Sequence, residues 1–206
     1  MPHDALLVVD VQNDFCPGGA LPVPSGDVIV PVLNAYINFF QRLGLPIFAS
    51  RDWHPAVSRH FQPFGGPWPI HCIQATPGAE FHPQLRLPKE AIIISKGVEP
   101  DQHGYSVFEG TDPQGRPFIQ VLRELGVERL FIGGLATDYC VRHSALDALR
   151  HGFAVWLLAD ASRGVDLQPG DSERAIAEIR RQGGKVATFA EVLATLGQRA
   201  QVPSGV

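Results

Sequence analysis

The chain has 206 residues, of which 45% are hydrophobic and 18% charged, and its formal net charge is −4. This length fits one globular domain over residues 1–206, and 17 scattered Lys and Arg residues are too few for a nucleic-acid surface. Only five apolar residues separate Asp4 from Asp10, so neither a signal-peptide core nor a membrane span fits the N-terminal segment. An odd number of distant cysteines fits reduced thiols. We expect a cytoplasmic protein that binds a small molecule and neither nucleic acid nor membrane, with a homo-oligomer left open.

Short runs of aliphatic and β-branched residues alternate with longer amphipathic segments along the chain. The runs predicted as strands are, in order, ALLVVDV, PIFASR, AIIIS, RLFIGG, FAVWLLAD and KVATF. Helices are predicted most clearly at residues 27–43, 117–125, 137–150 and 171–182. Continuous apolar strands separated by helices indicate a parallel sheet covered on both faces. We therefore predict an α/β fold, a three-layer α/β/α sandwich with a mostly parallel six-stranded sheet.

Two long segments do not follow this alternation. Residues 51–88 contain ten Pro or Gly and no sustained period, and residues 97–116 are similarly irregular. Loops of this length inside a compact domain usually take part in binding. The last residues, 197–206, are predicted to form a loose tail.

Reactive side chains are expected at one edge of the sheet. All strands of a parallel sheet end at the same edge, and ligands bind in the crevice outside those ends. Asp10 ends the first apolar run, Lys96 directly follows AIIIS, and Cys140 lies in the first turn of the helix after RLFIGG. Each alone has an ordinary explanation, as a capping carboxylate, a surface amine or a small core residue. Together they predict a site, because a buried carboxylate and a buried ammonium are tolerated when they are paired.

A thiol in the first turn of a helix is suited to nucleophilic attack. Thr137 or Asp138 is expected to cap this helix, and the unpaired N–H groups there would lower the pKa of the thiol and stabilise an oxyanion. In this hypothesis Asp10 is the base toward the thiol and the acid toward a departing amine, while Lys96 stabilises the charges between them. His143 is a rival base, but it lies on a helix flank and has no visible orienting partner.

The loop after the second predicted strand is rich in metal-binding side chains. Asp52, His54, His60 and His71 lie within twenty residues of one another, so three of the eight histidines fall in this loop. Imidazole and carboxylate at this density suit one divalent ion such as zinc, iron or manganese. The alternative is a set of surface histidines in a polar loop, and spacing alone does not decide between the two. Cys72 is left out, because adjacent residues seldom bind one ion.

Several motifs occur in order between about residue 5 and residue 165. They are VVDVQNDFCPGGAL, RDWHP, HC followed a few residues later by TPGAEFHP, SKG and GGLATDYCV. Together they closely resemble the nicotinamidases (pyrazinamidases) of the isochorismatase-like cysteine hydrolase superfamily. The resemblance implies hydrolysis of nicotinamide to nicotinate and ammonia, as in NAD salvage, through a thioester on Cys140 with Asp10 and Lys96 as catalytic partners. Pyrazinamide-like amides are the other substrates that it implies.

The same resemblance implies how metal and substrate are held. The metal ligands would be Asp52, His54, His60 and His71. The ion would be zinc, or else iron or manganese, and the pyridine nitrogen of the substrate would take an open coordination position. Phe15 and Trp68 match aromatic positions that flank the substrate ring in the family, and Tyr105 lies in the matching pocket-side segment.

The turn before the cysteine also resembles the family. The amides of Ala136 and Cys140 would form the oxyanion hole, and the family usually has a cis peptide in this turn, which here is Leu135–Ala136. Tyr139 stands where a histidine is frequent, a difference that leaves the catalytic set intact.

Three other functions remain as alternatives. One is another amide hydrolase of the superfamily with a different substrate, although isochorismatase-type and carbamoyl-amide hydrolases lack the four-residue metal cluster. The second is a metallohydrolase in which a metal-bound water attacks and Cys140 is only packed. The third is a non-catalytic metal-binding or scaffolding module, because fold alone does not determine function.

Overall fold

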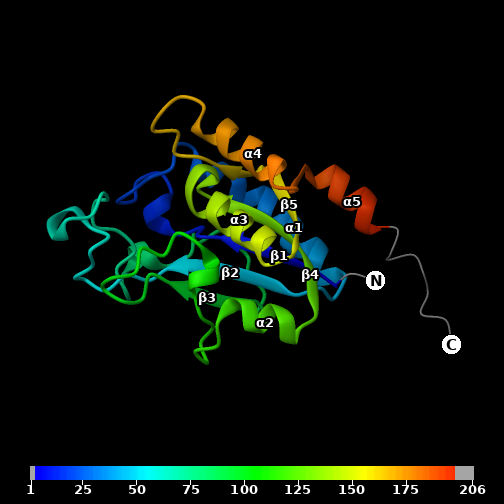
Figure 1. The fold of residues 1–206 in the computed structure, drawn as a ribbon, viewed down its shortest axis with the longest axis horizontal. Coiled ribbons are helices and arrows are strands. Elements are labelled where there is room, and N and C mark those ends of the chain that lie inside the picture. Colours follow the sequence, from blue (N-terminus) through cyan, green and yellow to red (C-terminus); the bar gives the residue numbers. More distant parts are fainter. Residues whose placement is uncertain (1–2, 198–206) are drawn as a thin grey trace.

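Six strands form one sheet in the computed structural model, which describes residues 3–197 (Figure 1). The strands are β1 (His3–Val9), β2 (Ile47–Asp52), β3 (Ile92–Lys96), β4 (Val127–Leu135), β5 (Ala154–Arg163) and β6 (Lys185–Ala187). Their order across the sheet is β3-β2-β1-β4-β5-β6, and every neighbouring pair is parallel. All six predicted strands are therefore present, and all their carboxyl ends lie at one edge.

Helices cover both faces of the sheet, which confirms the predicted three layers (Figure 1). The helices are α1 (Val30–Arg42), α2 (Phe118–Glu124), α3 (Arg142–Arg150), α4 (Asp171–Arg181) and α5 (Phe189–Gly197). Side chains alternate along β1, so that Leu6 and Val8 pack with α1 and α5, whereas Leu7 and Val9 pack with α2, α3 and α4. Each such fully buried aliphatic side chain stabilises the fold by about 1.5–3 kcal/mol.

The spacing of apolar residues explains the position of α1. Leu33, Tyr36, Ile37 and Phe40 follow the i, i+3, i+4, i+7 pattern and are buried along one face. The helix begins at Val30 rather than at the predicted residue 27, because residues 26–29 form a 3₁₀ turn. Gly44, with a φ of +66°, follows the helix in the left-handed region that stops helices.

Two helical predictions need correction. The segment predicted as a helix over 137–150 begins with a π-helical turn, Thr137–Val141, and only its second part is α3. Neither Thr137 nor Asp138 caps it, because the N-cap is Ala136 and no side chain bonds the first turn. Asp138 instead accepts hydrogen bonds from two backbone N–H groups of the loop after β5.

The C-terminal region differs from the prediction in one respect. Helix α5 was not among the predicted helices, and its final residue, Gly197, was assigned to the loose tail. The rest of that predicted tail lies outside the described residues. No helix among residues 3–197 has the length and apolarity needed to cross a membrane.

The two irregular segments lie beyond the carboxyl ends of β2 and β3 (Figure 1). Between these strands the chain forms two short 3₁₀ turns, Gln62–Phe64 and Pro77–Ala79, and isolated β-bridges. After β3 it forms another, Val107–Glu109, whose N-cap Ser106 makes a capping box with Glu109. These segments cover the sheet edge at which the reactive side chains were predicted.

Candidate active site and metal centre

The structure brings Asp10, Lys96 and Cys140 into contact. Asp10 directly follows β1, Lys96 ends β3, and Cys140 lies in the π-helical turn after β4. The Lys96 Nζ atom lies 2.7 Å from an Asp10 carboxylate oxygen and 3.5 Å from the Cys140 sulfur. All three residues are buried. Asp10 has a φ of +50°, which turns the chain sharply out of the strand.

The Lys96 ammonium is surrounded by acceptors. Besides Asp10 it contacts Asp52, at the end of β2, and it donates to the backbone carbonyl of Gly104 at 2.5 Å. Burial disfavours the charged amine, but the two carboxylates raise the pKa of Lys96 well above its usual range. Lys96 is therefore a fixed positive charge beside the sulfur. The ion pair with Asp52 was not predicted, because that residue was assigned only to the metal.

The protonation state of the thiol corrects a prediction. Burial raises the pKa of Cys140 well above its usual range, and a hydrogen bond to Asp10 adds to this effect, which the charge on Lys96 only partly opposes. The pKa is thus raised, not lowered as the helix-end argument predicted. The resting sulfur is a neutral thiol that needs a base.

Asp10 is placed to be that base. Burial raises the pKa of Asp10, Lys96 lowers it and Asp52 raises it again, so the net direction is upward. A higher pKa makes the carboxylate a stronger proton acceptor. The Ser50 hydroxyl donates a hydrogen bond of 2.7 Å to Asp10 Oδ1, the carboxylate oxygen that does not face Lys96, and so orients the carboxylate.

The turn that carries the cysteine has the predicted backbone form. The Leu135–Ala136 peptide is cis. The N–H groups of Tyr139 and Val141 both donate to the Ala136 carbonyl oxygen at 3.1 Å. Ala136 and Cys140, the two residues predicted to form the oxyanion hole, line the same cavity.

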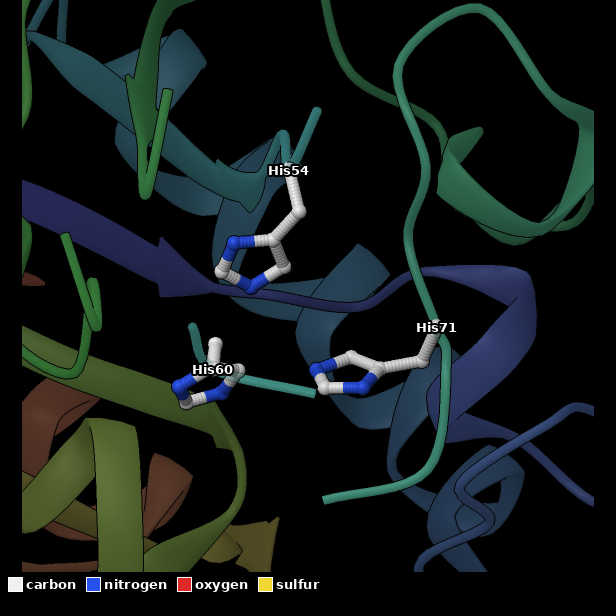
Figure 2. Close-up of side chains that lie close together, drawn as sticks. All are labelled: His54, His60 and His71. Carbon is white, nitrogen blue, oxygen red and sulfur yellow. The ribbon is translucent and has the colours of Figure 1, made fainter. Parts of the chain in front are cut away.

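The three histidines of the long loop converge on one centre (Figure 2). One ring nitrogen from each of His54, His60 and His71 lies within 4.8 Å of the other two, and all three residues are buried. The Nδ1 atom of His54 lies 3.0 Å from the Gly97 carbonyl oxygen, and that of His71 lies 2.8 Å from the Pro69 carbonyl oxygen. Their Nε2 atoms are left to face the centre.

Asp52 completes this cluster. Its second carboxylate oxygen lies 3.5 Å from His54 Nε2 and 3.8 Å from His71 Nε2. Burial alone would raise the pKa of Asp52, but Lys96 and the two imidazoles hold it well below its usual range, so the carboxylate is charged. Burial also lowers the pKa of His60 to about 3, which keeps that ring neutral.

These residues fit a bound metal ion. His54 Nε2 is buried and has no hydrogen-bond partner, which is costly for a polar atom without a ligand. Neutral imidazole nitrogens and one carboxylate oxygen are donors that zinc prefers. All four predicted ligands are therefore close together, and the surface-histidine alternative does not hold because the rings are buried.

A cavity lies between the histidine cluster and the Cys140 sulfur. Phe15, Trp68 and Tyr105, the three predicted substrate-binding residues, all line it. Trp68 Nε1–H donates to the Tyr105 hydroxyl at 2.8 Å, which ties the loop after β2 to the loop after β3. A cavity with mostly apolar and aromatic walls and few polar groups is typical of a small-molecule site.

Sequence reasoning missed several residues of the site. The cavity is also lined by Leu21, Val23, Leu135, Tyr139 and Val165. Gln12 is fully buried, and its amide accepts from the Asp52 N–H at 2.8 Å and donates to the Asp52 carbonyl at 2.8 Å. Its signal in the sequence was a polar residue directly after an apolar strand, two positions beyond Asp10.

The carboxyl edge of this parallel sheet holds a buried thiol, a lysine and a carboxylate beside a histidine cluster. This combination in an α/β/α sandwich defines a candidate cysteine hydrolase with a metal centre. The chain belongs to the isochorismatase family, because residues 4–191 match the Isochorismatase domain. This confirms the family that the motifs indicated.

Individual proteins that resemble this chain are nicotinamidases and pyrazinamidases. The chain is 41% identical to a nicotinamidase of Escherichia coli (strain K12), with 96% of this chain and 100% of the relative aligned. It is 39% identical to a nicotinamidase/pyrazinamidase of Mycobacterium tuberculosis, over 78% of this chain and 87% of the relative. The crystal structure of a pyrazinamidase of Pyrococcus horikoshii in complex with zinc superposes with a TM-score of 0.84 and 52% identity, covering 91% of this chain and 100% of the other.

Proposed function

We propose that this protein is a nicotinamidase, an amidohydrolase that converts nicotinamide and water to nicotinate and ammonia, and that also accepts pyrazinamide-like amides. The observation that carries the proposal is the contact of Cys140 with Lys96 and Asp10 on one side of an aromatic cavity whose other side is the histidine cluster. The likeness to nicotinamidases over nearly the whole chain supports the same substrate class.

The first half of the reaction acylates the cysteine. The Asp10 carboxylate takes the thiol proton while the Cys140 sulfur forms a bond to the amide carbon, and the carbonyl electron pair moves onto oxygen. The amides of Ala136 and Cys140 stabilise this oxyanion. When the C–N bond breaks, Asp10 returns the proton to the departing nitrogen, which leaves as ammonia, and a thioester remains.

The second half releases the acid. Asp10 takes a proton from a water molecule while the water oxygen attacks the thioester carbon. The C–S bond then breaks, and Asp10 passes that proton to the departing Cys140 sulfur. Lys96 keeps its charge throughout and balances the negative charge that moves between oxygen, sulfur and carboxylate. The rate gain comes largely from holding the amide carbon close to the sulfur in the cavity.

The metal centre serves substrate binding in this proposal. Asp52, His54, His60 and His71 would hold one divalent ion, with zinc first and iron or manganese as alternatives. When bound, the ion supplies a Lewis-acid position for the ring nitrogen of the substrate. Phe15, Trp68 and Tyr105 hold the faces and edge of the ring, so that the carboxamide points toward Cys140.

Ammonia release by the purified protein tests the activity. We expect release from nicotinamide and pyrazinamide but not from glutamine or carbamoyl amides, which lack a ring nitrogen for the metal position. Metal content measured on the same sample identifies the ion. A preparation that contains stoichiometric metal and releases no ammonia from either ring amide would refute the proposed activity.

Replacing Phe15 or Trp68 with alanine is expected to raise KM for nicotinamide about tenfold, because losing one stacking contact weakens binding by about 1.4 kcal/mol. The change in kcat should be smaller, since neither ring touches the reacting atoms in the proposed mechanism. Phe64→Ala is the control, because Phe64 lies on the same loop as Trp68 but its side chain is exposed. Unchanged steady-state constants in both cavity variants would argue against ring stacking.

A further inference from the structure

The three histidines of the metal centre differ in what holds their rings. The Nδ1 atoms of His54 and His71 each face a backbone carbonyl oxygen, at 3.0 and 2.8 Å. The Nδ1 atom of His60 instead lies 3.3 Å from Nδ1 of His103. Two of the ligands are therefore oriented by the main chain, and the third is oriented by another side chain.

This difference determines which tautomer each ring can adopt. A carbonyl oxygen only accepts hydrogen bonds, so it places the ring proton on Nδ1 and leaves the Nε2 lone pair for a metal. An imidazole nitrogen can donate or accept. The contact between His60 and His103 is compatible with a metal on Nε2 of His60 only when His60 donates and His103 accepts.

We propose that His103 is a positioning residue of the metal centre, whose Nδ1 accepts the Nδ1–H of His60 and thereby directs the Nε2 lone pair of His60 toward the centre shared with His54 and His71. This inference rests on the proposed function, because it requires these histidines to bind the metal. His103 itself does not touch the metal or the substrate.

The surroundings of His103 hold its ring in place. The side chain is exposed, and its ring stacks on Tyr105 with 6.0 Å between centroids and an interplanar angle of 14°. The ring centroids of His103 and His60 are 5.6 Å apart. Because Tyr105 is itself tied to Trp68 by a hydrogen bond, the stack restrains the acceptor even at the surface.

The segment that carries His103 contacts the rest of the site as well. The Gly97 carbonyl oxygen accepts from His54, and the Gly104 carbonyl oxygen accepts from Lys96 at 2.5 Å. The loop after β3 therefore orients two metal ligands and the catalytic lysine together. Only the contact made by His103 can be removed by a substitution without altering the main chain.

The test compares zinc affinities of metal-free proteins by competition with a chromogenic chelator at fixed pH. His103→Phe keeps a flat ring to stack on Tyr105 but removes the acceptor, and we expect its Kd for zinc to rise about tenfold or more, as for other residues that support a ligand. His103→Asn places an amide oxygen near the position of Nδ1, and we expect it to recover most of the affinity. The visible spectrum of bound cobalt should change in His103→Phe and not in His103→Asn.

His143→Phe is the matched control, because His143 stacks on Tyr105, with 5.2 Å between centroids, without contacting a metal ligand. Its zinc affinity should equal that of the wild type. Equal affinities of the wild type and His103→Phe would overturn the inference, and so would equal losses in His103→Phe and His103→Asn. If the wild type itself bound no zinc, the metal centre of the proposed function would fail, and ammonia release would show separately whether the amidase activity remains.

Discussion

Cys140→Ala is expected to lower kcat for nicotinamide by about 10⁴-fold or more, because it removes the atom that bonds to the amide carbon. The substrate cavity and the metal ligands remain, so nicotinamide should still bind. Steady-state ammonia release measures the first effect, and equilibrium binding of nicotinamide to the inactive variant measures the second. A mass spectrum of the wild type quenched during turnover should show the nicotinoyl adduct on Cys140, and the variant should show none.

Cys16→Ala is the matched control for this substitution. Cys16 is also a buried thiol, and burial raises its pKa to about 11, but the proposed mechanism gives it no role. Its replacement should leave kcat near the wild-type value. Near-normal turnover of Cys140→Ala would instead favour the metallohydrolase alternative, in which the cysteine is only packed.

Removing the metal is expected to lower kcat/KM about 100-fold or more while leaving most of the fold intact. Substrate orientation depends on the metal centre in the proposed mechanism, whereas the two core clusters lie along the faces of the sheet. Dialysis against a chelator, followed by activity and circular dichroism, measures both effects. Added zinc should restore activity.

His54→Ala should reproduce the metal-free state, because it deletes the buried Nε2 atom that has no hydrogen-bond partner. His151→Ala is the control, since His151 is an exposed histidine just beyond the end of α3 and lies outside the cluster. The control should keep its metal and its activity. Full activity in a chelated sample whose metal content is verified as zero would contradict the assigned role of the cluster.

Much of the catalytic site could be predicted from positions at strand ends. Asp10 and Lys96 follow apolar runs that are separated by more than eighty residues, yet parallel strands must end at a common edge. That rule predicts that both residues lie close to Cys140. The four proposed metal ligands could be predicted as a group because they are close in sequence.

Predictions from the sequence were wrong where neighbours from distant segments decide the chemistry. The pKa of Cys140 was predicted to be lowered by a helix end, but burial and a hydrogen bond to Asp10 raise it. Thr137 or Asp138 was predicted to cap a helix, but neither does, and the Asp138 carboxylate accepts hydrogen bonds from the loop after β5 instead. Each error came from a local rule applied to a side chain whose partners are not local.

The order of apolar and amphipathic segments by itself determined the layered α/β fold and the edge where the site forms, because periodicity dictates which faces are buried. Only the tertiary structure decided that Asp52 is shared between Lys96 and the histidine cluster, that Gln12 anchors Asp52, and that His103 contacts His60. Hydrogen bonds and charge pairs act over about 3–4 Å between residues tens of positions apart. Such distances are set by packing, which no local sequence pattern encodes.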